Sequence, residues 1–215
     1  MDGVQMASRI SGILSPIENL YMAVVSAIPL KQMKVWVSAY FHPVDAYNQN
    51  KKDANFGAVA VHLILIVLLG WVASVLQAAF EPNSLALSSR LNGIIFSLVY
   101  LLIAGFIVSA ACWVIAKVLG GKGGFMEQTL ALALIYGGYT VIAFPFAVIG
   151  GGIGFAFGAI AALIALYNLY VMIKEVHSLS SGRAVIVALL PIIIAVLIVM
   201  LVIAALGASS GSRAI

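Results

Sequence analysis

Five long apolar runs, separated by short polar segments, constrain this chain more than any other feature. None contains Asp, Glu or Arg, and the only lysine is Lys117, near the end of the second run. A charge at the centre of a membrane-spanning helix costs about 2.5 to 3.5 kcal/mol, so such runs are typical of helices buried in lipid. Helices are favoured over open strands because every backbone group in lipid must be hydrogen bonded. The predicted spans are residues 57–80, 91–119, 128–149, 153–173 and 184–206.

The composition argues against a soluble domain. Only 8% of the residues are charged, whereas a soluble domain has roughly 25%. The net charge is +4, but the basic residues are scattered, so we expect anionic lipid headgroups and not nucleic acid as the counter-charge. The predicted fold class is all-α integral membrane: a five-transmembrane-helix bundle at residues 57–207, after a cytoplasmic, interfacial amphipathic region at 1–56 and before a short extracytoplasmic tail at 208–215.

Three glycines at residues 150–152 separate the third and fourth runs. A single helix through both would be roughly 70 Å long, so two crossings joined by a tight hairpin are predicted. Five spans then divide the basic residues unevenly, and the positive-inside rule places the N-terminus in the cytoplasm and the C-terminus outside. The cytoplasmic side receives Arg9, Lys31, Lys34, Lys51, Lys52, Lys117, Lys122, Lys174 and Arg183, and the other side receives Arg90 and Arg213.

The first 56 residues are less apolar and predict helices that lie in the membrane interface. Ser15-Pro16-Ile17-Glu18 has the form of a capping box, and apolar residues follow at helical spacing until Pro29. A second stretch places Leu30, Met33, Val37 and Tyr40 on one face, with Lys31, Lys34 and Trp36 directed to the headgroups. Pro43 restarts a turn or helix that leads to the first span. The alternative is a mobile tail.

No set of residues predicts catalysis, a metal site or a cofactor site, so an enzyme is not expected. The histidines His42, His62 and His177 form no H-E-x-x-H pattern, no G-x-S-x-G occurs, and Cys112 is the single cysteine. His62 is interpreted as a hydrogen-bonded packing residue and not as a proton relay. The glycine-lysine-glycine segment at 120–124 lacks the spacing of a phosphate-binding loop, so it predicts a flexible turn.

Two groups of residues inside the spans allow different interpretations. The first is a ladder of small residues that would let helix backbones approach closely, either within the chain or in a homo-oligomer; it consists of Gly150, Gly154, Gly158 and Ala162. The second is a set of polar residues that could line a seam in a channel or carrier for a small solute or lipid. It consists of Tyr100, Ser109, Tyr139 and Asn168.

Three segments resemble the Ypt-interacting-protein (Yip) family. Residues 119–145 read LGGKGGFMEQTLALALIYGGYTVIAFP, residues 167–184 read YNLYVMIKEVHSLSSGRA before Leu189-Leu190-Pro191, and residues 41–47 read FHPVDAY. The resemblance implies five spans with a cytoplasmic N-terminus and no catalytic residues. Eukaryotic members bind prenylated Rab GTPases, but this chain lacks their Asp-Leu-Tyr-Gly-Pro element. That departure argues against Rab binding and favours a prokaryotic-type member in the cell membrane, the alternative being the endoplasmic reticulum or Golgi.

The loop after the fourth span has the densest polar cluster between spans, and short loops on rigid helices are well placed for recognition. The candidate contact residues for a partner or lipid are Lys122, Lys174, Glu175, His177 and Arg183. Alternatively, this loop only caps the fifth span and anchors it to headgroups. The expected function is a non-enzymatic scaffold or adaptor that binds membrane lipids, another membrane protein or a second copy.

Overall fold

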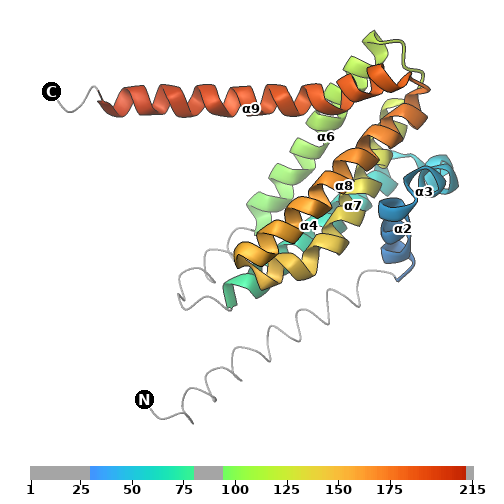
Figure 1. The fold of residues 1–215 in the computed structure, drawn as a ribbon. Coiled ribbons are helices and arrows are strands. Elements are labelled where there is room, and N and C mark those ends of the chain that lie inside the picture. The colour runs from blue at the N-terminus through green and yellow to red at the C-terminus, as the bar shows by residue number, and fades with distance from the viewer. Residues whose placement is uncertain (1–29, 80–93, 212–215) are drawn as a thin grey trace.

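The computed structural model describes residues 30–79 and 94–211, and over these ranges the chain forms helices and no strand. Four of the described helices are long and apolar enough to cross a membrane. Figure 1 shows three of them, α4, α7 and α8, running side by side with α6. The four candidate spans are α4 (Phe56–Ala79), α7 (Phe125–Ile149), α8 (Gly151–His177) and the first part of α9 (Ser181–Gly211).

The predicted second span corresponds to α6 (Ile94–Val118). The continuous part of α6 whose side chains are described, Leu102–Val118, is apolar but shorter than the length required of a candidate span. The structure therefore confirms an all-helical chain with four candidate spans, whereas the number five stays a prediction. The predicted helix around residues 15–28 lies outside the described residues, as do Arg90 and Arg213.

The predicted hairpin between the third and fourth runs is present. Gly150 and Gly151 have φ angles of +65° and +60°, a region that suits glycine because it has no Cβ. α8 then turns back along α7, and Gly154 is buried so closely against the Phe146 carbonyl that a Cβ would collide with it. Phe146 and Phe157 stack across the hairpin with their ring centroids 5.0 Å apart.

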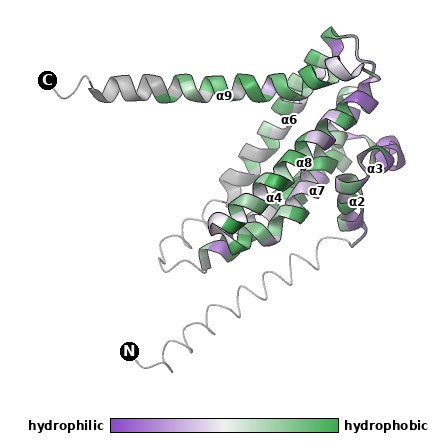
Figure 2. Ribbon diagram, in the orientation of Figure 1, coloured by the Kyte–Doolittle hydropathy of each residue, from purple (hydrophilic) through white to green (hydrophobic). Residues whose placement is uncertain are grey.

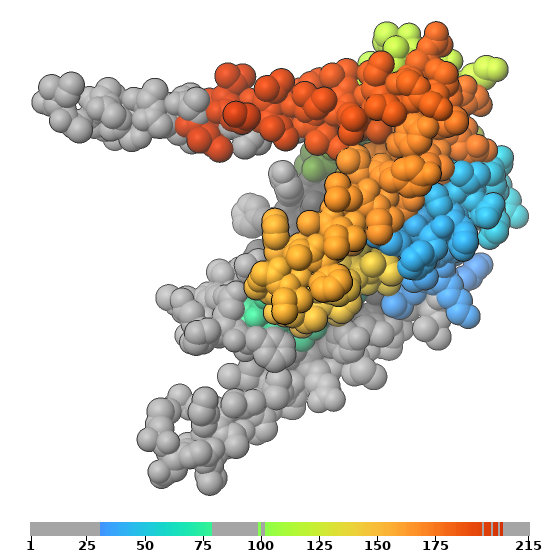
Figure 3. All heavy atoms as spheres, viewed as in Figure 1, coloured from blue at the N-terminus to red at the C-terminus, as the bar shows by residue number. Residues whose placement is uncertain are grey.

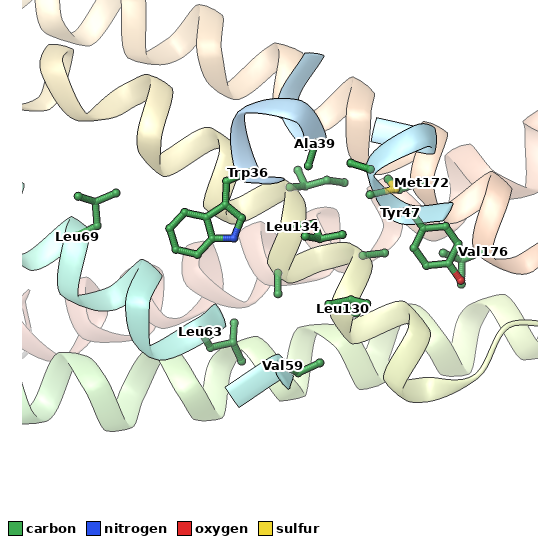
Figure 4. Packing of buried hydrophobic residues seen from close by; sticks show 14 residues of the cluster. Trp36, Ala39, Tyr47, Val59, Leu63, Leu69, Leu130, Leu134, Met172 and Val176 are labelled. Atoms are coloured by element: carbon green, nitrogen blue, oxygen red, sulfur yellow. The ribbon is translucent and has the colours of Figure 1, made fainter. Parts of the chain in front are cut away.

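α7 lies at the centre of the packed bundle, in contact with α2, α4, α6 and α8. Leu130 and Leu134 of α7 are completely buried. Figure 4 shows them among residues of α2, α4 and α8, including Trp36, Leu63 and Met172. The core of this membrane protein therefore includes a segment from the N-terminal region as well as its spans.

That segment comprises α2 (Leu30–Phe41) and α3 (Pro43–Asn50), followed by a short 3-10 turn, η1 (Lys51–Asp53). The predicted restart at Pro43 is confirmed, since proline occupies the first turn of α3. The prediction that Trp36 is directed to the headgroups is wrong, because its side chain is 0% exposed. A Cβ on Gly137 of α7 would lie 2.5 Å from the Trp36 ring, so that glycine provides the space that the indole occupies.

α9 departs from the bundle. Its first turns pack against α6 and α8 through Ala184, Val187 and Ala188, which are buried. Figure 1 and Figure 3 show the rest of the helix extending away from the other helices. The described side chains of this part are apolar and exposed, for example Leu197 at 54% and Leu201 at 70%.

Candidate functional site

The three segments that resemble the Yip family meet at one end of the bundle. The loop of residues 119–124 lies against the last turn of α8, and α3 packs against α7 and α8 beside it. Figure 2 shows hydrophilic residues gathered at this end, around α3 and the start of α9. We call the loop of residues 119–124, the last turn of α8 (residues 174–177) and Arg183 the cap.

Glycines let the loop of the cap fold tightly onto α8. The Gly121 amide donates to the Ala116 carbonyl at 2.7 Å and reverses the chain after α6. The Lys122 amide then donates to the His177 carbonyl at 3.1 Å. A Cβ on Gly123 would lie 2.5 Å from Cγ1 of Val176 and 2.6 Å from its carbonyl oxygen. This turn was predicted to be flexible, but its neighbours leave no room for side chains at Gly121 and Gly123.

A buried polar pair lies under this loop. His177 and Gln128 are both 0% exposed, and Nε2 of His177 lies 2.7 Å from Oε1 of Gln128. A carboxamide oxygen can only accept, so Nε2 of His177 donates this hydrogen bond. Among the described residues, Nδ1 of His177 and Nε2 of Gln128 have no hydrogen-bond partner. The pair joins the end of α8 to the first turn of α7.

Side chains from α6 and α9 bind the loop from outside. Nη1 of Arg183 donates to the Leu119 carbonyl at 3.0 Å, and Nζ of Lys117 donates to the Lys122 carbonyl at 3.1 Å. Nε1 of Trp113 donates to the Gly123 carbonyl at 3.2 Å. Side-chain donors thus satisfy three carbonyls of the loop. These hydrogen bonds hold the positive charges of Lys117 and Arg183 close together at the surface.

The start of α7 supplies a negative charge near the cap, and the neighbouring Tyr47 is uncharged. Oε2 of Glu127 accepts from the Gly124 amide at 2.8 Å and so caps α7. Tyr47 of α3 is buried beside Val176, as Figure 4 shows. Burial, together with the nearby carboxylates of Glu127 and Glu175, raises the pKa of Tyr47 to about 12. Tyr47 therefore stays neutral at physiological pH.

The structure separates the five predicted contact residues into two kinds. The side chains of Lys122, Lys174, Glu175 and Arg183 are exposed. His177 is completely buried, so in this conformation it positions the loop and does not reach a partner. Sequence reasoning missed Gln128, which marks only the start of the third apolar run in the sequence. The only available signal was a polar residue at the start of an apolar run, and the sequence does not identify its partner.

A second buried polar cluster fixes α2 against α4. Nε1 of Trp36 donates to Nδ1 of His62 at 2.9 Å, and Nε2 of Gln32 lies 3.0 Å from the same nitrogen. His62 is 9% exposed. An indole N–H can only donate, so this nitrogen of His62 acts as an acceptor. His62 is a hydrogen-bonded packing residue, as its sequence position was interpreted.

The residues of the predicted polar seam lie in separate environments. Ser109 is fully buried, and its hydroxyl lies 2.6 Å from that of Thr129. Nδ2 of Asn168 donates to the Tyr40 carbonyl at 2.6 Å, which ties α8 to α2. Tyr139 lines the groove between α7 and α8, and the side chain of Tyr100 lies outside the described residues. The described members of the set therefore do not line a common path.

The ladder of small residues has two different halves. Gly150 forms the hairpin turn and Gly154 packs against the backbone of α7. A Cβ on Gly158 would meet no atom within 4 Å, and Ala162 is exposed. Both residues line the open groove between α7 and α8. Contact within the chain thus accounts for the first half of the ladder only.

Comparison with known proteins identifies the family. A family model described as the Yip1 domain matches residues 37–203. No curated protein and no solved structure matches the chain. The match extends from α2 to the distal part of α9 and includes the three segments that meet at the cap. The chain belongs to the Yip1 domain family and is a multi-pass integral membrane protein.

Proposed function

We propose that the protein is a non-enzymatic membrane scaffold or adaptor of the Yip type, whose cytoplasmic face binds protein or lipid partners. The observation that carries this proposal is the cap, where the loop of residues 119–124 is hydrogen bonded to the last turn of α8 and to Arg183 of α9. Lys122, Lys174, Glu175 and Arg183 are exposed on this surface. Long charged side chains on a fixed backbone are suited to recognising acidic groups.

The proposed topology places the cap in the cytoplasm and includes α6 as a fifth span. The 25 residues of α6 form a helix about 37 Å long, which exceeds the roughly 30 Å of a bilayer's hydrocarbon core. With α6 counted, the cap and α3 lie on the side that carries most of the lysines and arginines, in agreement with the positive-inside rule. The membrane we propose is a prokaryotic cell membrane. Rab-type GTPases are not the expected partners.

Cross-linking in native membranes tests the proposal. The variant Lys122→Glu/Lys174→Glu reverses two exposed charges of the cap, and the matched control Lys122→Arg/Lys174→Arg keeps them. We expect a repeated set of cross-linked proteins or co-purified lipids from the wild type and the control. The charge-reversed variant should lose this set at least several-fold while reaching the membrane in equal amount. An unchanged set, or no enriched neighbour in any sample, would contradict the proposal.

A further inference from the structure

An apolar groove runs between α7 and α8 on a face that α9 leaves uncovered. One section has a volume of about 540 Å³ and is lined by Leu132, Tyr136, Leu163 and Leu169 among others. A second section, of about 450 Å³, continues past Gly158 toward the hairpin. The two sections share Tyr139, Ala159 and Ala162, so they form one continuous groove along α8.

We propose that the distal half of α9, residues 192–211, closes into this groove of its own chain by bending at Pro191. Ile192 is the residue that directly follows the proline, and it already lines the groove. Buried residues of α9 end at Ala188, and the described residues beyond Pro191 are exposed. The path into the groove therefore begins at the position where α9 leaves the bundle.

Pro191 provides the bend. Proline has no backbone N–H, so the Val187 carbonyl lacks its usual helical partner, and the proline ring crowds that carbonyl. Sharp kinks in helices occur at such prolines. The helix before Pro191 is held by packing of Val187 and Ala188 against the end of α8. The distal half can thus change direction while the first turns stay fixed.

The lengths of α8 and α9 match for closure. Both helices diverge from the short connection around Leu179, so residues at equal separation from it face each other in an antiparallel pair. Leu197 and Leu201 lie 18 and 22 residues after Leu179, and Ala162 and Gly158 lie 17 and 21 residues before it. The large side chains of α9 then meet the small residues of α8, with both sets repeating every fourth residue. Such pairing of large with small residues permits close helix packing in lipid.

Closure also gives α9 a direction compatible with a bilayer. In the extended position the helix runs away from α7 and α8, as Figure 1 shows. Closed, it runs along them and crosses the same hydrocarbon layer, where its backbone is hydrogen bonded and its side chains meet lipid or protein. Gly158 and Ala162, the unpaired half of the small-residue ladder, then acquire a partner within the chain.

Disulfide formation in membranes tests the closed state in the full-length protein. With Cys112 replaced by alanine, the pair Gly158→Cys and Leu201→Cys should cross-link within one chain. The matched control pairs Gly158→Cys with Ile203→Cys, which is equally exposed in the extended helix but lies about 200° around it. Trypsin cuts after Lys174 and Arg183, so an internal disulfide joins two fragments until it is reduced. We expect at least a five-fold higher yield for the Leu201→Cys pair.

A second variant separates closure from folding. Gly158→Leu meets no atom within 4 Å of its Cβ in the extended structure, but its side chain fills the groove. Cross-linking of Ala162→Cys with Leu197→Cys should therefore fall several-fold in Gly158→Leu, with unchanged thermal stability. Pro191→Ala should lower the same yield. The proposal would be overturned by equal yields for the Leu201→Cys and Ile203→Cys pairs, or by no cross-link at all. It would also be overturned by cross-links that form only between two differently tagged copies, a result that would indicate exchange of α9 between copies.

Discussion

At the scale of single residues, the cap depends on glycines that contact α8 where a side chain would not fit. Gly123 is enclosed by Val176 and by Nδ1 of His177, to which its Cβ would lie 3.1 Å away. Gly124 follows directly, but its Cβ would approach nothing closer than 3.6 Å. Two adjacent glycines therefore have different tolerances, although the sequence does not distinguish them.

Replacing Gly123 by alanine should separate the loop from α8 and destabilise the protein by about 1 to 3 kcal/mol, the usual cost of overpacking. Gly124→Ala is the matched control and should change stability by less than about 0.5 kcal/mol, as surface substitutions do. Chemical or thermal unfolding of the purified protein in detergent measures both. Equal effects of the two substitutions would show that the loop is not packed as described.

At the scale of helices, α2 is held on the bundle by contacts that involve backbone as much as side chains. A Cβ on Gly138 would lie 2.6 Å from the Trp36 carbonyl, so α2 and α7 approach very closely. The Tyr40 hydroxyl donates to the Ala161 carbonyl of α8 at 3.0 Å. Burial raises the pKa of Tyr40, which keeps this hydroxyl a donor. α2 is thus held against α4, α7 and α8.

Gly137→Ala should displace α2, because the new methyl group would occupy the position of the Trp36 ring. Gly70→Ala is the matched control: it lies in α4, has no atom within 4 Å of its Cβ, and gains the same helix propensity. Trypsin cleavage after the exposed Lys31 and Lys34 should accelerate several-fold in Gly137→Ala only. If cleavage is equally slow in both variants, Trp36 does not hold α2 in place.

At the scale of the whole molecule, the proposed topology requires the two ends of the chain to lie on opposite sides of the membrane. Cysteines introduced by Ser8→Cys and Ser212→Cys, with Cys112 replaced by alanine, report on each end. An impermeant maleimide applied to intact cells should modify Ser212→Cys at once, but Ser8→Cys only after permeabilisation. Modification of both cysteines to the same extent in intact cells would indicate an even number of crossings.

The helices and the tight hairpin were predictable from the sequence because their causes are local. The apolar runs match α4, α6, α7, α8 and α9, and the glycines at 150–152 mark the turn between two of them. The burial of Trp36 and His177 was not predictable. Amphipathic spacing indicates which face of a short helix is apolar. It carries no information about Gly137, which lies 101 residues after Trp36 and provides the space for its ring.

The sequence by itself determined that this chain forms long membrane helices, because the cost of placing charge and unpaired backbone in lipid acts on each segment separately. It also determined the family, through segments that keep their order along the chain. Only the tertiary structure decided that these segments meet in the cap, that His177 points inward and that half of the small-residue ladder faces an open groove. Those features depend on how closely two backbones approach in space, which is a property of pairs of helices and not of any one segment.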